Sequence, residues 1–119
     1  MKEVQDIQEN FKRGIIDYVI LLLLNEEDMY PYQISQEVTE RSHGKLKFFV
    51  GSMYGPIRRM MANNEITERR VIVGERRFRN YYHIEPAGKE YLSAMQKEYN
   101  DLIAGIRYMV QSTDKHEGK

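Results

Sequence analysis

A chain of 119 residues and 14.2 kDa has the size of one ordinary domain. Hydrophobic residues make up 41% of it and charged residues 30%, a composition that excludes both a disordered chain and a membrane protein. Cysteine is absent, which excludes disulfide bonds, thiolate metal sites and a cysteine nucleophile.

The net charge is zero, but the charges are unevenly distributed along the chain. Residues 1–40 carry three Lys/Arg against nine Asp/Glu, residues 41–83 carry ten against three, and residues 84–119 carry five against six. A basic middle third on an otherwise neutral chain is typical of a surface that contacts phosphates. A solvated basic face without a partner is the alternative.

No membrane or export signal is expected. The first six residues are mixed in charge and lead into no cleavable apolar segment, which favours a cytoplasmic protein. The longest apolar run, Ile15 to Leu24, has ten residues interrupted by Asp17, about half of what a bilayer span requires. We expect this run to be a buried helix.

Two helices are predicted before residue 42. Apolar residues recur at spacings of three and four from Val4 to Leu22, which predicts a helix of about five turns that ends at residues 25–28. Its second half is nearly all apolar and should lie in the core, whereas its first half could form an arm. A second helix should begin at Pro31, whose fixed φ suits a first turn, and run to about Arg41.

A third helix is predicted from about Gly51–Ser52. Its inward face comprises Met53, Tyr54, Ile57, Met60 and Met61, and its opposite face presents Ser52, Gly55, Pro56, Arg59 and Asn63, with Arg58 on the flank. Because a proline costs little only in a first turn, Pro56 predicts a late helix start.

A β-hairpin and a final helix complete the predicted order. Residues 66–84 change to a strand-like pattern around Gly74–Glu75, which predicts a hairpin with a basic tip. Glu85–Pro86 opens a last helix whose apolar residues step by three and four to Val110. The polar tail from Gln111 is expected to fray.

This order predicts a mainly α fold with a small β-hairpin: a winged helix-turn-helix with an N-terminal arm helix and a C-terminal dimerisation helix. We divide it into a DNA-binding domain, residues 1–85, and a dimerisation helix with its tail, residues 86–119. Small and basic residues on a third helix suit the major groove of DNA, and arginines on a wing suit phosphates or the minor groove. The predicted DNA-contacting residues are Lys45, Lys47, Ser52, Tyr54, Gly55, Arg58, Arg59, Arg76, Arg77 and Arg79. The alternative is a winged-helix module that docks an acidic protein.

Several motifs resemble the PadR-like family of bacterial transcriptional regulators over about residues 12–92. They are Arg13 to Leu24, Met29 to Ile34, Gly51 to Met60, and Tyr81 to Ile84 followed by Gly88. The resemblance implies a dimeric winged-helix repressor of the smaller branch, with an extra C-terminal helix that makes the dimer. Three features depart from the family pattern: Pro31, Glu85 and the weakly charged segment from Met60 to Asn64. The weak charge of this segment leaves base specificity open.

Dimerisation is also expected from the residues themselves, because the last apolar stripe is longer than a core of this size can cover. The predicted dimer residues are Val4, Ile7, Phe11, Leu92, Met95, Tyr99, Leu102, Ile103, Ile106 and Met109. A twofold dimer predicts an inverted-repeat operator with half-sites one helical turn apart. The alternative is an α-hairpin within one chain.

The resemblance further implies a small aromatic or lipophilic effector. Tyrosine and methionine form amphipathic, deformable walls, and the predicted effector residues are Phe11, Tyr18, Tyr91, Met95 and Tyr99. An ordinary core role for these residues is the alternative.

An enzyme is not expected. The histidines His43, His83 and His116 lack metal-ligand spacing, and no glycine-rich phosphate loop is present. We predict neither a cofactor nor a metal.

Overall fold

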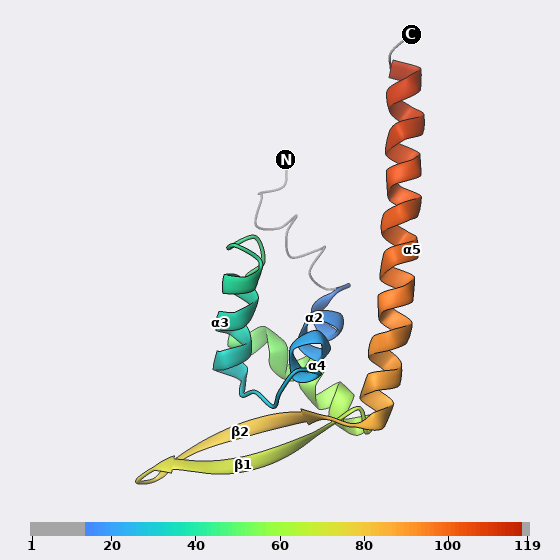
Figure 1. The fold of residues 1–119 in the computed structure, drawn as a ribbon. Coiled ribbons are helices and arrows are strands. Elements are labelled where there is room, and N and C mark those ends of the chain that lie inside the picture. The colour runs from blue at the N-terminus through green and yellow to red at the C-terminus, as the bar shows by residue number, and fades with distance from the viewer. Residues whose placement is uncertain (1–13, 118–119) are drawn as a thin grey trace.

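The computed structural model describes residues 14–117 and, within them, the side chains up to residue 114. In chain order the elements are α2 (Ile16–Leu24), α3 (Pro31–Arg41), α4 (Val50–Ala62), β1 (Ile66–Gly74), β2 (Arg77–Ile84) and α5 (Pro86–Glu117). Figure 1 shows three short helices packed together, a hairpin extending from them on one side, and α5 running far past them. The mainly α winged helix-turn-helix fold is thereby confirmed.

Helix α3 has the predicted bounds, but the predicted continuous helix from Val4 to Leu22 is wrong, because Gly14 and Ile15 form a turn and α2 begins only at Ile16. The apolar run buries Ile20, Leu21, Leu23 and Leu24 in the centre of the domain, and α2 ends before Asn25 as expected. Pro31 occupies the first turn of α3, where its missing N–H would have had no helical partner. The predicted arm, including Val4, Ile7 and Phe11, lies outside the described residues.

The predicted late start of the third helix is wrong. Helix α4 begins at Val50, so Pro56 lies inside it. The proline removes the hydrogen bond that would reach the Ser52 carbonyl, but Ser52 is exposed, so water can satisfy that group. Burial of Met53, Ile57 and Met60 along one face maintains the helix across this defect.

The hairpin is anchored at one end and free at the other. Strands β1 and β2 pair antiparallel from Ile66 with Ile84 to Gly74 with Arg77. Ile66, Tyr82 and Ile84 are buried at the base, whereas the outer residues of both strands are mostly exposed. A bridge between Met29 and Tyr82 attaches the base to the segment that precedes α3. This hairpin, the wing, therefore projects from the domain, and both of its faces are mostly exposed towards the tip (Figure 1).

Helix α5 is longer than expected. It continues to Glu117, although we expected the chain to fray from Gln111. Residues 111–117 contain neither glycine nor proline, so nothing in them breaks a helix that already exists. Near its start, Gly88 packs against the backbone of Glu65, and Leu92 is buried in the core. None of the helices in the described part of the chain is long and apolar enough to span a bilayer.

Candidate nucleic-acid interface

Helix α4 presents small and basic residues on the side away from its buried face. Ser52, Gly55 and Arg58 are exposed, and a Cβ added to Gly55 would meet nothing within 4 Å. Tyr54 is 42% exposed, so it lies at the edge of the buried face and not within it. This face can approach another molecule closely.

The wing arginines are held by aromatic rings. The guanidinium carbon of Arg79 lies 4.3 Å from the ring centre of Tyr30, and that of Arg70 lies 5.2 Å from the ring centre of Phe78. Such stacking orders a guanidinium while leaving its edges able to bind phosphate. At the tip, Arg76 adopts the left-handed conformation with φ 60°, beside Arg77, the last paired residue.

A groove joins the wing to α4. Tyr54 and Arg79, both predicted to contact DNA, line it together, and its volume is about 230 Å³. The predicted DNA-contacting residues did not include the other residues that line this groove, although four of them are aromatic. They are Tyr30, Pro31, Tyr32, Val50, Phe78, Asn80 and Tyr82.

Lys45 and Lys47 lie in the connection between α3 and α4, at some distance from the wing. The beginning of α3 adjoins the wing through the bridge of Met29 with Tyr82. The 11 residues of α3 place its far end roughly 16 Å from there. The candidate interface therefore has Lys45 and Lys47 at one end and the arginines of the wing tip at the other.

Six of the predicted cations are available to a partner. Among the side chains described, up to residue 114, no ion pair engages Lys45, Lys47, Arg58, Arg76, Arg77 or Arg79. By contrast, Arg69 pairs with Asp28 at 3.4 Å, and the same carboxylate lies 2.7 Å from His83 Nδ1. Burial raises the pKa of Asp28, but the hydrogen bonds from His83 and Arg69 outweigh burial, so the pKa of Asp28 is lowered.

Arg59 is placed differently from the prediction. Its Nη2 donates to both oxygens of Asp17, at 2.6 and 2.7 Å, so its guanidinium is directed to α2 and away from the outward face. The long side chain reaches the carboxylate from the flank of α4 because Asp17 is buried and needs a charged partner. Sequence reasoning noted Asp17 only as an interruption of an apolar run. A lone carboxylate within an apolar run was the signal in the sequence that a charged partner for Asp17 was needed.

The predicted dimer residues that the structure describes differ in exposure: Tyr99 stacks on Tyr18, and Ile103 is half-buried. Leu92 is buried in the core of its own chain and Met95 packs against that core, so these two are not a free surface. Leu102, Ile106 and Met109 are 64%, 57% and 64% exposed on the projecting part of α5. Within the described residues, no other element covers this apolar face of α5.

The predicted effector residues in the described part of the chain gather between α2 and α5. The rings of Tyr18 and Tyr99 have centroids 5.2 Å apart, and the Tyr91 hydroxyl donates to Asp17 at 3.0 Å. Tyr18, Tyr91 and Met95 are partly buried and pack against the core, and Phe11 lies outside the described residues.

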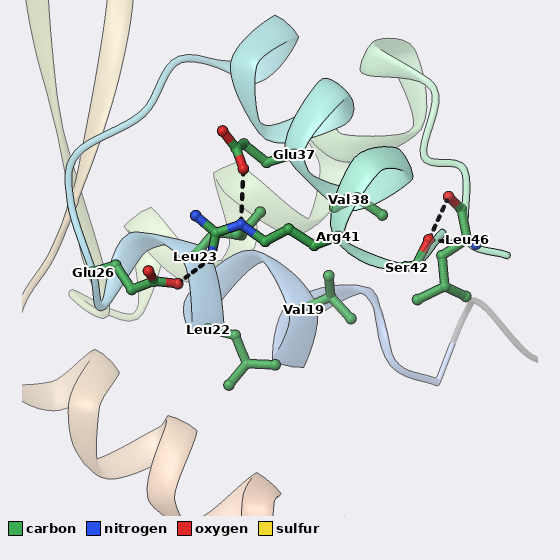
Figure 2. Close-up of a pocket in the computed structure, with 9 residues that line it drawn as sticks. All are labelled: Val19, Leu22, Leu23, Glu26, Glu37, Val38, Arg41, Ser42 and Leu46. Atoms are coloured by element: carbon green, nitrogen blue, oxygen red, sulfur yellow. Dashed lines mark hydrogen bonds and ion pairs between the residues drawn. The ribbon is translucent and has the colours of Figure 1, made fainter. Parts of the chain in front are cut away.

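A separate apolar pocket lies between α2 and α3. Figure 2 shows Arg41 crossing it to reach Glu26 and Glu37, with Val19 and Leu22 of α2 below. Its volume is about 350 Å³, within the range of small-molecule sites. The lining residues are Val19, Leu22, Leu23, Glu26, Glu37, Val38, Arg41, Ser42 and Leu46. Among the described residues, no cluster of three or more His, Asp and Glu could hold a metal ion.

A short helical pair followed by an outward-facing third helix and a cationic hairpin defines a winged helix-turn-helix protein. The family described as "Transcriptional regulator PadR-like family" matches residues 20–94. The chain belongs to this PadR-like family of transcriptional regulators.

Its relatives agree with this assignment. A transcriptional regulator from Clostridium thermocellum is 28% identical, covers 82% of this chain and 95% of its own, and has a TM-score of 0.76. A PadR family regulator from Clostridium difficile is 26% identical over 81% of this chain and 98% of its own, with a TM-score of 0.67. An uncharacterized protein of Lysinibacillus sphaericus is 31% identical over 81% of this chain and 88% of its own.

Bacillus subtilis PadR, whose structure contains operator DNA, shares the fold. It is 22% identical over 69% of this chain and 46% of its own, with a TM-score of 0.64. At this identity the comparison concerns the fold alone.

Proposed function

We propose that the chain is a homodimeric repressor that binds an inverted-repeat operator in double-stranded DNA. In this proposal α4 enters the major groove, with Ser52, Tyr54, Gly55 and Arg58 nearest the bases. Arg76, Arg77 and Arg79 of the wing and Lys45 and Lys47 of the preceding loop bind the flanking phosphates.

One observation carries this proposal. An exposed helix face of small residues adjoins cations that no carboxylate within residues 14–117 neutralises, among them Arg58 and Arg77. A helix can lie against the groove walls only where its side chains are short, and unneutralised cations release counterions when they meet phosphates. Bacillus subtilis PadR, which shares the fold, has a structure in complex with operator DNA, and this supports DNA as the partner.

The exposed apolar face of α5 supports the dimer. Leu102, Ile106 and Met109 together form a stripe that a second copy can cover about a twofold axis. Two recognition helices related in this way read half-sites about 34 Å, one turn of DNA, apart. Repression follows because a dimer seated over a promoter excludes polymerase.

We further propose that a small aromatic compound releases the dimer from DNA by binding where Tyr18, Tyr91, Met95 and Tyr99 meet. The stacked rings at the junction of α2 and α5 support this position. A ligand can act there only if it binds more tightly to a dimer geometry in which the spacing of the two recognition helices does not match the operator. Tyr99→Leu should abolish the response, whereas a ligand in the pocket between α2 and α3 should respond to Val19→Phe instead.

Selection of bound duplexes from a random pool tests the central proposal. We expect enrichment of an inverted repeat, and affinity that falls with salt with a log-log slope near −0.9 for each phosphate neutralised. Repression is checked with a reporter gene placed behind the selected operator. Recovery of unrelated sequences would contradict specific binding. Tight binding to an acidic protein, with no binding to duplexes in dilute buffer, would favour the alternative of a protein-docking module.

A further inference from the structure

We propose that Arg59 is a positioning residue, which fixes the recognition helix to α2 and α5 through Asp17 and so sets the half-site spacing that the dimer reads. This inference rests on the proposed function. It assigns Arg59 a role different from base contact.

The cluster joins three helices that are distant in sequence. Asp17 of α2 accepts two hydrogen bonds from Arg59 of α4, at 2.6 and 2.7 Å, and a third from the hydroxyl of Tyr91 of α5, at 3.0 Å. Asp17 is the only charged residue that is buried among those described. One carboxylate is therefore the common attachment point of the DNA-reading helix and the helix that makes the dimer.

The chemistry favours a fixed geometry. A buried carboxylate is stable only when its oxygens are occupied, and charge-assisted bonds to a guanidinium are short and directional. The hydrogen bonds that Arg59 donates to Asp17 raise the pKa of Arg59, and burial together with the bond to Asp17 raises the pKa of Tyr91, so both groups remain protonated as donors. A rotation of α5 about its axis moves the Tyr91 hydroxyl relative to Asp17 and strains the bond between them.

A second contact begins one residue further along α2. The ring of Tyr18 lies against that of Tyr99, two turns beyond Tyr91 on α5. The later part of α5 projects past the other elements (Figure 1), and its apolar residues Leu102, Ile106 and Met109 are exposed. The orientation in which the projecting helix leaves the domain is therefore set by Asp17 and Tyr18 together, and α4 shares the first of these two residues.

The test measures affinity for inverted repeats whose spacing is changed in single base-pair steps. We expect Arg59→Ala, Asp17→Asn and Tyr91→Phe to reduce the preference for the best spacing by at least about fivefold. Base preference within each half-site and the salt slope should stay as in the parent, because no DNA contact is lost. Arg59→Lys, which keeps one charged donor, should recover part of the preference.

Arg41→Ala is the matched control. Arg41 also binds two groups, Glu26 and Glu37, but it joins α3 to the end of α2 and touches neither α4 nor α5. This variant should keep the spacing preference of the parent. If Arg59→Ala lowers the salt slope or changes base preference while Asp17→Asn and Tyr91→Phe bind like the parent, Arg59 contacts DNA directly and the inference is wrong.

A distance measurement separates this inference from the proposed function. The chain has no cysteine, so spin labels at Ala62→Cys on α4 and Ala104→Cys on α5 report one intramolecular distance when labelled chains are diluted with unlabelled ones. The distance distribution should broaden in Tyr91→Phe and Asp17→Asn but not in Arg41→Ala. A chain that ignores DNA yet shows this broadening refutes only the proposed function. Unchanged distributions refute the positioning role.

Discussion

Gly88 shows how one residue can set a contact between elements. A Cβ added to Gly88 would collide with the Glu65 carbonyl oxygen and lie 2.8 Å from Ile84 Cγ1. Only glycine allows the first turns of α5 to approach the beginning of β1 this closely. This position is therefore fixed by packing, independently of any DNA contact.

Replacing Gly88 with alanine should destabilise the fold by about 1 to 3 kcal/mol, the usual cost of overpacking. Urea unfolding followed by circular dichroism checks this. Gly105→Ala is the control, because a Cβ there meets nothing within 4 Å and alanine favours a helix by about 1 kcal/mol. Equal stability of the two variants would contradict the packing argument.

Glu65 should make stability depend on pH. Burial and the nearby Asp17 carboxylate raise the pKa of Glu65, and its Oε1 has no hydrogen-bond partner within the described residues. The folded state therefore holds a proton on Glu65 more tightly than the unfolded state does. Its contribution to stability is greatest below the ordinary glutamate pKa and declines as the pH rises through the raised value.

Glu65→Gln should accordingly be more stable than the parent at pH 7, and the difference should shrink towards pH 4. Urea midpoints at the two pH values check this. The exposed Glu90→Gln variant should change little at either pH. A Glu65→Gln variant that loses stability at pH 7 would show that the carboxylate charge is favourable in the fold.

At the scale of elements, α4 and the wing should contribute differently to DNA binding. Arg58 lies on the helix face and Arg77 at the tip of the hairpin. A contact to a base edge discriminates between sequences, whereas a contact to a phosphate strengthens binding to all sequences alike.

We therefore expect Arg58→Ala to relax base preference at one position by about 1 to 3 kcal/mol. Arg77→Ala should weaken binding to all duplexes equally and reduce the slope of log affinity against log salt concentration by about 1. Anisotropy titrations on single-base variants of the selected operator check both. Arg41→Ala serves as the control for loss of one positive charge. If Arg58→Ala and Arg77→Ala change affinity across the operator variants in the same way, the helix and the wing do not differ in how they contact DNA.

Local patterns predicted the bounds of α3 and the hairpin because those elements carry their own signals, a proline in a first turn and a change of period. The beginning of α4 could not be predicted in this way. Tertiary burial of Met53, Ile57 and Met60 outweighs the local cost of Pro56. The partner of Asp17 was equally hidden, since Arg59 lies 42 residues away in sequence.

At the scale of the whole molecule, the projecting part of α5 should control assembly. Ile106 lies on the exposed apolar stripe, and Ala104 lies about 160° away around the helix axis, at about 100° per residue. The two positions differ mainly in which side of the helix they occupy.

Ile106→Glu should therefore give a monomer with weak operator binding, because a charge would be buried at the interface. Ala104→Glu should remain dimeric and bind like the parent. Light scattering coupled to size-exclusion chromatography, with anisotropy on the same samples, checks both. A dimeric Ile106→Glu variant would place the interface elsewhere.

The length of α5 has a mechanical consequence. About 18 residues follow Tyr99 in one uninterrupted helix, which spans roughly 27 Å at 1.5 Å per residue. A tilt of only five degrees at the Tyr18–Tyr99 contact would move the far end by more than 2 Å, about half of a helical pitch. Small adjustments of two stacked rings are thus amplified into displacements comparable with the spacing between neighbouring base pairs.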